Sequence, residues 1–476
     1  MNPNEFADLF LEFEHRNRMF SIKVNNVHIW HFIRFNIYFD LLRKLGMADA
    51  LLSVSQNMNS KATWKDVVIE KTICNQFFAT KREVLIISNG RKYKDGKYYK
   101  CIYTSLVDKF LNNTHYVLDP KSVENRFERQ KSHNIIYFDV ESYKKWKKIK
   151  IANEIVAKSE INTLIIEKIE KYFNICFELE YKKRLLNTIT GIINQRKYMI
   201  SYYNYILNKI QPKIILLVCY YSFDNMVLCE VAKKRNIPVV ELQHGALGYT
   251  AIQYNFYKKM NLNWFPDYFF SFGSFVKNKA RFPIADNRVI PVGFPELEQN
   301  SVLYKTNKGT KKIILFISEG DNKIFKYVNL VAQKLNPQKY HIILQLHPKE
   351  YYDWKKNIGK YLSVSNVEVR GSFEHIIHES LGMADWVIGN YSTVLYEAQM
   401  FDAKVVVLKY GLYTIVEELY QLGCALLVDS PEQLVSEIEK DTFCPNREAS
   451  IFQRNSLNNI QININKIIKN HLGEEN

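Results

Sequence analysis

The sequence lacks the features that mark several large protein classes. Its 476 residues contain seven cysteines, an odd number with no CxxC pair, which argues against a disulfide framework and a structural zinc site. No stretch approaches the roughly 18 uninterrupted apolar residues of a membrane-spanning helix. The opening residues Met1-Asn2-Pro3-Asn4-Glu5 have neither the basic start nor the apolar run of a secretory signal. We therefore expect a cytoplasmic protein.

Motifs of several common enzyme classes are also missing. No GxxxxGK[ST] loop is present, which argues against P-loop phosphotransfer, and no GxGxxG follows the first apolar run, which argues against a dinucleotide-binding dehydrogenase. No GxSxG supports a hydrolase. The nearest approach to the paired acids of a metal-dependent transferase is Asp139 with Glu141, an isolated pair of a kind common at strand ends. We predict neither a metal ion nor a cofactor.

Positive charge is in excess, since 65 Lys and Arg against 49 Asp and Glu give a formal net charge of +16. A basic protein of this size is attracted to nucleic acid, to an anionic membrane surface or to polyanionic substrates. No helix-turn-helix, zinc-finger or RNA-binding signature accompanies the lysines, so no nucleic-acid partner is predicted. Two explanations stay open: peripheral contact with the inner face of a membrane, and a general abundance of Lys, Asn, Ile and Tyr.

Short apolar runs alternate with helical segments along most of the chain, a pattern typical of parallel β-sheets flanked by helices. The length favours two domains, and a polar, lysine-rich stretch at 297–311 separates two series of apolar runs. We predict an α/β fold with two Rossmann-type parallel-sheet lobes facing a central cleft. The first lobe covers 1–300, with a helical extension at 1–75, and the second covers 301–476. Within the extension, 27–42 is interpreted as a helix packed on the first lobe, because a membrane anchor would need a clearer basic face.

Polar residues follow four of the predicted strands directly. Because ligands of parallel sheets gather at the carboxyl ends of strands, we expect these residues to line the cleft. They are Gln243-His244-Gly245, Glu319-Gly320, His347-Pro348 and Ser392-Thr393. The placement of four polar segments directly after strands is stronger evidence for a binding site than any single motif.

Each candidate has a chemical role and a structural alternative. His244 can take a proton from a hydroxyl near neutral pH, and Gly245 would let the backbone turn sharply; the alternative is a turn histidine bonded to backbone. His347 can hold a phosphate. Ser392 and Thr393 open a predicted helix and form an anion site, unless Asn390 or Ser392 merely caps it. One turn later, Glu397 is either a ribose ligand or a solvent-facing carboxylate.

The chain resembles bacterial glycosyltransferases of the GT-B fold that build capsules and lipopolysaccharide. The resemblance lies in Leu242-Gln243-His244-Gly245, Val292-Gly293-Phe294-Pro295, Leu346-His347-Pro348 and Asn390–Ala398, all between residues 242 and 398. A His-Pro pair followed by a Ser/Thr pair is similar to the donor site of sialyl- and Kdo-transferases, which use CMP-sugars. Similar elements occur in CDP-glycerol polymerases of teichoic-acid synthesis. The acidic-acidic-glycine motif of sialyltransferases is replaced by Ser318-Glu319-Gly320, at the start of the second lobe instead of in the first.

The resemblance implies an inverting, metal-independent transferase that moves a sugar from a nucleotide donor to a glycan or lipid-linked glycan acceptor. In that interpretation His244 is the base, and Gln243 and Gly245 lie on the acceptor side. The donor is bound by Glu319, Gly320, His347, Ser392, Thr393 and Glu397. Alternatives are a CDP-glycerol-type glycerophosphotransferase, a sugar-nucleotide epimerase of the same fold, and a non-enzymatic assembly factor. An acidic residue instead of His244 as the base also stays open.

Overall fold

A computed structural model gives the fold of the chain. It describes residues 3–46, 74–88, 92–95, 98–118, 134–149, 154, 156–245, 247–305, 309–351, 354–358, 360–372, 375–447 and 451–473. Contacts between Cα atoms divide the chain into two compact units. The first unit comprises 1–271, 276–291 and 457–476, and the second comprises 272–275 and 292–456.

The first unit is built on a seven-stranded sheet in which every strand pair is parallel. Its strands, in spatial order, are β11 (Val289–Pro291), β10 (Tyr268–Ser271), β9 (Val239–Leu242), β8 (Ile214–Leu217), β3 (Val84–Ser88), β6 (Thr114–Leu118) and β7 (Ile135–Tyr137). The central strands β3, β8 and β9 are buried along their whole length. Continuous burial explains their apolar sequences, because helices cover both faces of a parallel sheet.

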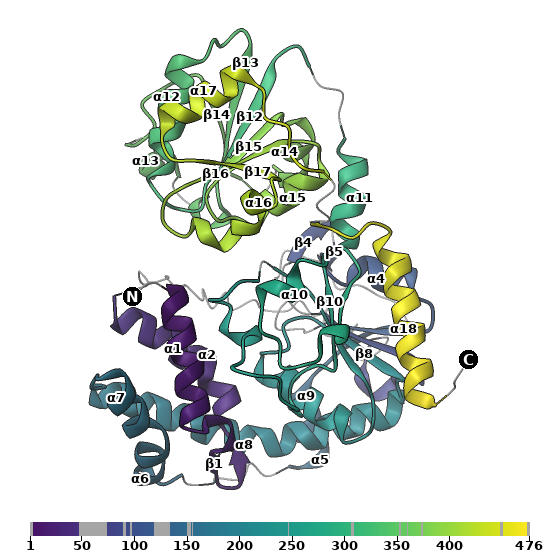
Figure 1. The fold of residues 1–476 in the computed structure, drawn as a ribbon. Helices are drawn as coiled ribbons and strands as arrows, with labels where there is room; N and C mark the ends of the chain where they lie inside the picture. Colours follow the sequence, from purple (N-terminus) through teal and green to yellow (C-terminus); the bar gives the residue numbers. More distant parts are fainter. Residues whose placement is uncertain are drawn as a thin grey trace. The chain divides into compact units, whose positions relative to one another are not determined.

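Helices of the first unit fall into an N-terminal group and a group beside the sheet (Figure 1). They are α1 (Pro3–Arg16), α2 (Trp30–Lys44), α4 (Ser105–Phe110), α5 (Val140–Lys147), α6 (Lys158–Ile161), α7 (Glu167–Phe173), α8 (Leu179–Ile210), α9 (Phe223–Lys233), α10 (Val276–Lys279) and α18 (Ser456–Leu472). Buried aromatic and aliphatic residues of α1, α2, α7 and the start of α8 form one core cluster. Two short hairpins complete the unit, β1 (Lys23–Val24) with β2 (Val27–His28) and β4 (Lys92–Asp95) with β5 (Tyr98–Cys101).

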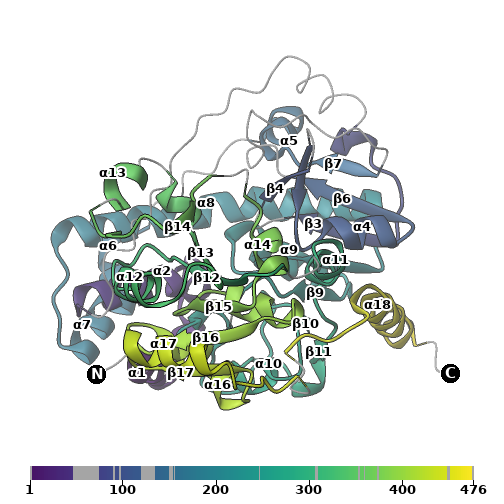
Figure 2. The ribbon, with the colours of Figure 1, turned by 90° about the horizontal axis from the view of Figure 1, so that it is seen from above.

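The second unit contains a six-stranded parallel sheet. Its strands, in spatial order, are β14 (Val367–Arg370), β13 (Tyr340–Gln345), β12 (Lys312–Ile317), β15 (Trp386–Gly389), β16 (Lys404–Leu408) and β17 (Ala425–Val428). Its helices are α11 (Pro295–Leu303), α12 (Ile324–Lys334), α13 (Trp354–Ile358), α14 (Ile377–Met383), α15 (Val394–Glu397), α16 (Glu417–Gln421) and α17 (Pro431–Lys440). Helices α12 and α17 lie side by side over one face of the sheet and share its core (Figures 1 and 2).

Two parallel-sheet lobes with an N-terminal helical segment are therefore confirmed, as the fold class predicted. Three details differ from the expectations. The predicted linker at 297–311 begins inside α11, whose first residue is Pro295, a favoured residue at a helix start. Edge strand β14 was missed because its residues Val-Glu-Val-Arg are all only partly buried and therefore mixed in polarity. Helix α18 belongs to the first unit by its contacts, whereas the predicted division at residue 300 placed it in the second. The part of the predicted helical extension at 47–73 lies outside the described residues.

Candidate active site

His244 lies just beyond the carboxyl end of β9, where its ring is surrounded by hydroxyl groups. The Tyr221 hydroxyl lies 3.1 Å from Nε2, and the Tyr254 hydroxyl lies 3.5 Å from Nδ1. Tyr103 donates a hydrogen bond of 2.5 Å to the His244 carbonyl oxygen. The His244 side chain is 18% exposed, so solvent or a substrate can still reach it. Three segments distant in sequence thus converge on one imidazole.

Glu241, the third residue of β9, is the buried acid of this cluster. Its side chain is fully buried, and its Oε1 lies 3.7 Å from His244 Nδ1. Oε1 accepts hydrogen bonds from the Tyr254 hydroxyl at 2.6 Å and from the Tyr220 N–H at 3.2 Å. Burial raises the pKa of this carboxyl to about 8, even though the Tyr254 hydrogen bond lowers it. Near pH 7 Glu241 is therefore mainly the neutral acid.

Tyr254 is held in place by the N-terminal helices. It ends a 3-10 turn at Ile252–Tyr254, and Arg34 of α2 donates hydrogen bonds to the carbonyl oxygens of Ile252 at 2.7 Å and Asn255 at 3.0 Å. Arg34 is itself paired with Glu14 of α1 through two hydrogen bonds of 2.7 Å. The predicted packing of the 27–42 helix on the first lobe is confirmed by these contacts. Its arginine fixes the backbone on both sides of Tyr254.

Gln243 and Gly245 flank His244 with different local roles. Gln243 is buried and donates a hydrogen bond of 2.8 Å to the Gly245 carbonyl oxygen, which closes the chain around His244. The chain bends at Gly245, as expected, but Gly245 is absent from the residues with positive φ, so the bend does not require glycine. A Cβ atom at Gly245 would meet nothing within 4 Å.

In the second unit, Glu319 joins two of the loops that follow strands. Its carboxylate oxygens accept from the Tyr391 N–H at 3.2 and 3.3 Å, which links the end of β12 to the end of β15. Burial raises the pKa of Glu319 to about 8, while the N–H groups of Tyr391 and Ser392 lower it. Gly320 follows with φ of +84°, a conformation that glycine adopts without strain. Glu319, Gly320 and Ser392 therefore share one edge of the sheet.

His347 is attached to the same edge through Glu350. The His347 N–H donates to Glu350 Oε2 at 2.8 Å, and the Ser318 hydroxyl donates to Oε1 at 2.9 Å. Burial raises the pKa of Glu350 as well. Glu350 ties the ends of β12 and β13 together, so the His347 loop is fixed beside the Ser318-Glu319-Gly320 turn.

Ser392 and Thr393 precede α15, which is only 4 residues long. Asn390 does not cap this helix, because its side chain donates to the carbonyl oxygens of Leu408 and Tyr410 instead. Thr393 occupies the N-cap without a side-chain cap bond, and Ser392 Oγ accepts only a long bond of 3.4 Å from Val394. The Ser392 side chain also hydrogen-bonds to Glu319, whereas the Thr393 hydroxyl makes no cap bond, and one helical turn supplies little dipole.

Glu397 is not the solvent-facing carboxylate considered as an alternative. Its Oε2 lies 3.0 Å from His378 Nε2, and the two side chains are 15% and 13% exposed. His378 Nδ1 in turn lies 2.9 Å from the Asn300 amide nitrogen. Glu397 thus belongs to a polar cluster between α11, α14 and α15, and its assignment as a ribose ligand stays a prediction.

In the described part of the chain, no three His, Cys, Asp or Glu side chains come together as a metal ion would require. Asp139, one of the two acids considered for a metal, accepts a hydrogen bond of 3.0 Å from the Ser142 N–H at the start of α5. Within the described residues, no helix has both the length and the apolar character to cross a bilayer.

Glu241, Tyr221, Tyr254 and Tyr103 were not identified from the sequence. Glu241 had one available signal, since it is the only charged residue in the buried strand Val-Val-Glu-Leu and stands three positions before a histidine. The tyrosines carried no such signal, because they reach His244 from separate segments.

No protein-family model and no curated protein matches the chain. Among solved structures, the wall teichoic acid polymerase TagF is similar over 93% of this chain and 98% of its own, with 13% identity and a TM-score of 0.43. A UDP-GlcNAc 2-epimerase from Methanocaldococcus jannaschii is similar over 81% of this chain and 99% of its own, with 12% identity and a TM-score of 0.47. The enzyme of the same name from Neisseria meningitidis covers 58% of this chain and 82% of its own, with 17% identity and a TM-score of 0.42. Similarities of this extent assign no ligand or activity, and the two sheets themselves establish the fold.

Proposed function

We propose that the chain is a glycosyltransferase that moves a sugar from a nucleotide donor to a surface-polysaccharide acceptor. The observation that carries the proposal is the setting of His244, a partly exposed imidazole between Tyr221 and a buried carboxyl at the carboxyl end of a parallel sheet. A neutral imidazole in this setting can remove a proton from an acceptor hydroxyl. His244 Nε2 is the accepting atom, because Nδ1 faces Glu241 and Tyr254.

Glu241 is the positioning residue for this base. At 3.7 Å it is beyond hydrogen-bond distance from Nδ1, so it acts through its place on the Nδ1 side of the ring, where it accepts the hydrogen bond of the Tyr254 hydroxyl. Because Glu241 is neutral near pH 7, it places no negative charge beside the imidazole.

The donor is assigned to the second unit, with Ser392 and Thr393 hydroxyls and His347 around its phosphate. Glu319 is compatible with an anion there, since a carboxyl with a pKa of about 8 is neutral near pH 7 and does not repel phosphate. The displacement is proposed to be in-line and inverting, without a metal ion. CMP-linked sugars are the first candidates for the donor.

Thermal-shift measurements with CMP, CDP, UDP, GDP and dTDP test the nucleotide assignment, because a ligand of the folded form raises its stability. The matching activated donors are then incubated with and without acceptor. Consumption of a UDP-sugar without acceptor would replace the proposal by an epimerase, and transfer from CDP-glycerol would replace it by a glycerophosphotransferase. Stabilisation by none of the nucleotides would contradict the donor site.

A further inference from the structure

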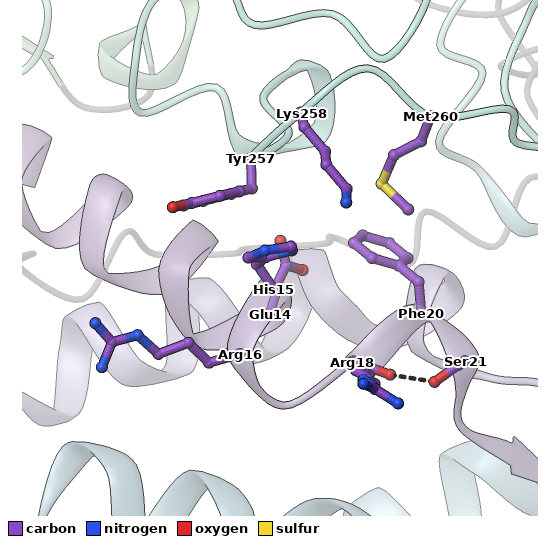
Figure 3. A pocket seen from close by; sticks show the side chains of 9 residues that line it. All are labelled: Glu14, His15, Arg16, Arg18, Phe20, Ser21, Tyr257, Lys258 and Met260. Atoms are coloured by element: carbon purple, nitrogen blue, oxygen red, sulfur yellow. Dashed lines mark hydrogen bonds between the residues drawn. The ribbon is translucent and has the colours of Figure 1, made fainter.

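A cavity of the first unit lies between the end of α1 and the chain at 257–260 (Figure 3). Its volume is about 570 Å³, within the range of small-molecule sites. The lining residues are Glu14, His15, Arg16, Arg18, Phe20, Ser21, Tyr257, Lys258 and Met260. None of them belongs to the cluster around His244, so the proposed chemistry leaves this cavity without a role.

Lys258 supplies the cation of the cavity. Its side chain extends across the cavity toward His15 and Phe20, whereas the Arg16 and Arg18 side chains lie away from Lys258 (Figure 3), and Arg16 is paired with Glu12. Neither Arg18 nor Lys258 forms an ion pair with any acid that the structure describes. The single acid of the lining, Glu14, is buried and already neutralised by Arg34 at 2.7 Å. A cavity with charge of one sign and apolar walls concentrates anions.

Aromatic rings supply a flat wall beside this cation. The rings of Tyr257 and His15 are stacked, with centroids 4.3 Å apart and planes at 7° (Figure 3). Tyr257 is 50% exposed and also lines an adjoining cavity of about 360 Å³. The two cavities therefore form a continuous stretch of surface around one tyrosine, large enough for a ring-shaped ligand.

We propose that this cavity binds a sugar residue that carries a carboxylate or phosphate group. The oxyanion lies at the Lys258 ammonium group, and the sugar ring lies against Tyr257 and Phe20. Identification of this sugar as part of the acceptor rests on the proposed function.

The test measures binding of glucuronic acid, glucose 6-phosphate, glucose and inorganic phosphate to the full-length protein by saturation-transfer NMR. Both anionic sugars should bind saturably, and glucose should not. Equal binding of inorganic phosphate would overturn the proposal in favour of a plain anion site, and equal binding of glucose would remove the role of charge. The difference between the two anionic sugars identifies which oxyanion the site prefers.

Two variants locate the binding in this cavity. Lys258→Glu should weaken the anionic sugars about fivefold or more, whereas Lys234→Glu, an equal charge change at an exposed residue of the same unit, should leave them unchanged. Equal effects of the two lysine variants would overturn the site.

A membrane surface is the remaining occupant to exclude. Wild-type protein and Lys258→Glu are sedimented with phosphatidylglycerol vesicles; binding that depends on Lys258, together with no binding of the sugars, would overturn the proposal. None of these measurements requires turnover, and His244→Ala should bind the sugars as wild type does. Failure here and failure of the proposed transferase activity are therefore separate results.

Discussion

Glu241→Gln tests the neutral acid beside His244 most directly. Glutamine has nearly the same shape, and its amide oxygen can still accept from Tyr254 at the position of Oε1, 2.6 Å away. It cannot ionise. Folding raises the pKa of Glu241 from its ordinary value of 4.5 to about 8, so the native and unfolded chains hold the proton over different pH ranges.

The sign of the stability effect follows from these two values. Below pH 4.5 both states are protonated and Glu241 makes no pH-dependent contribution. Between pH 4.5 and about 8 the unfolded chain loses the proton while the native chain keeps it, so stability falls as pH rises. At pH 7 the accumulated penalty is about 3 kcal/mol, from roughly 1.4 kcal/mol for each pH unit. Glu241→Gln abolishes this penalty.

The assay compares urea unfolding of wild type and Glu241→Gln at pH 5 and pH 7. Between pH 5 and pH 7, the free energy of unfolding of Glu241→Gln should rise by about 2 to 3 kcal/mol relative to that of wild type. The pH-dependent contribution of Glu319 cancels in this difference, because both proteins contain Glu319. In turnover with the identified donor at pH 7, kcat and KM should change little, because a neutral amide replaces a neutral acid of nearly the same shape. Parallel pH curves of stability would refute the neutral acid, and a large fall in kcat at pH 7 would show that the ionised carboxylate takes part in turnover.

Four further outcomes are expected. His244→Ala should lower kcat by about a hundredfold or more while the nucleotide-induced thermal shift stays intact; an equal loss of nucleotide affinity would contradict its role as base. Ser392→Ala with Thr393→Ala should show the reverse, with about tenfold weaker nucleotide binding in calorimetry. Nucleotide affinity should decrease as pH rises through about 8, where Glu319 ionises beside the phosphate, and Glu319→Gln should remove that decrease. Tyr221→Phe should shift the acidic limb of the rate profile, because its hydroxyl lies 3.1 Å from His244 Nε2.

The strands that position the site could be predicted because a strand that is buried on both faces has a continuous apolar sequence. Val-Val-Val in β16 and Ile-Ile-Leu-Leu in β8 are apolar throughout, and the first polar residue after such a run marks the carboxyl end. His244, Glu319, His347 and Ser392 were all located in this way. Strand β14 has no continuous apolar sequence, because an edge strand is exposed along one side.

The neighbours of these residues could not be predicted, because they depend on contacts between distant segments. Tyr103 reaches the His244 carbonyl across 141 positions, and Arg34 reaches the Asn255 carbonyl across 221. For Glu397, the sequence predicted a site but not the contacts of the side chain. Its position one turn after Ser392 suggested the donor site, and its carboxylate lies 3.0 Å from His378 on a different helix.

The pair of Arg34 and Glu14 gives the N-terminal helices their part in the site. Burying an ion pair costs desolvation that its attraction only partly offsets, and apolar residues of similar size are often as stabilising. Stability alone therefore does not account for a buried arginine among the aromatic residues of α1 and α2. The geometry of its hydrogen bonds accounts for this arginine, because the guanidinium group binds Glu14 on one side and the carbonyl oxygens of Ile252 and Asn255 on the other. These carbonyls flank Tyr254, whose hydroxyl holds Glu241 beside His244. The helices thus position Tyr254 and Glu241 beside His244, the proposed base, through one arginine, and a lysine there would lack the planar fork that binds Glu14 through two hydrogen bonds.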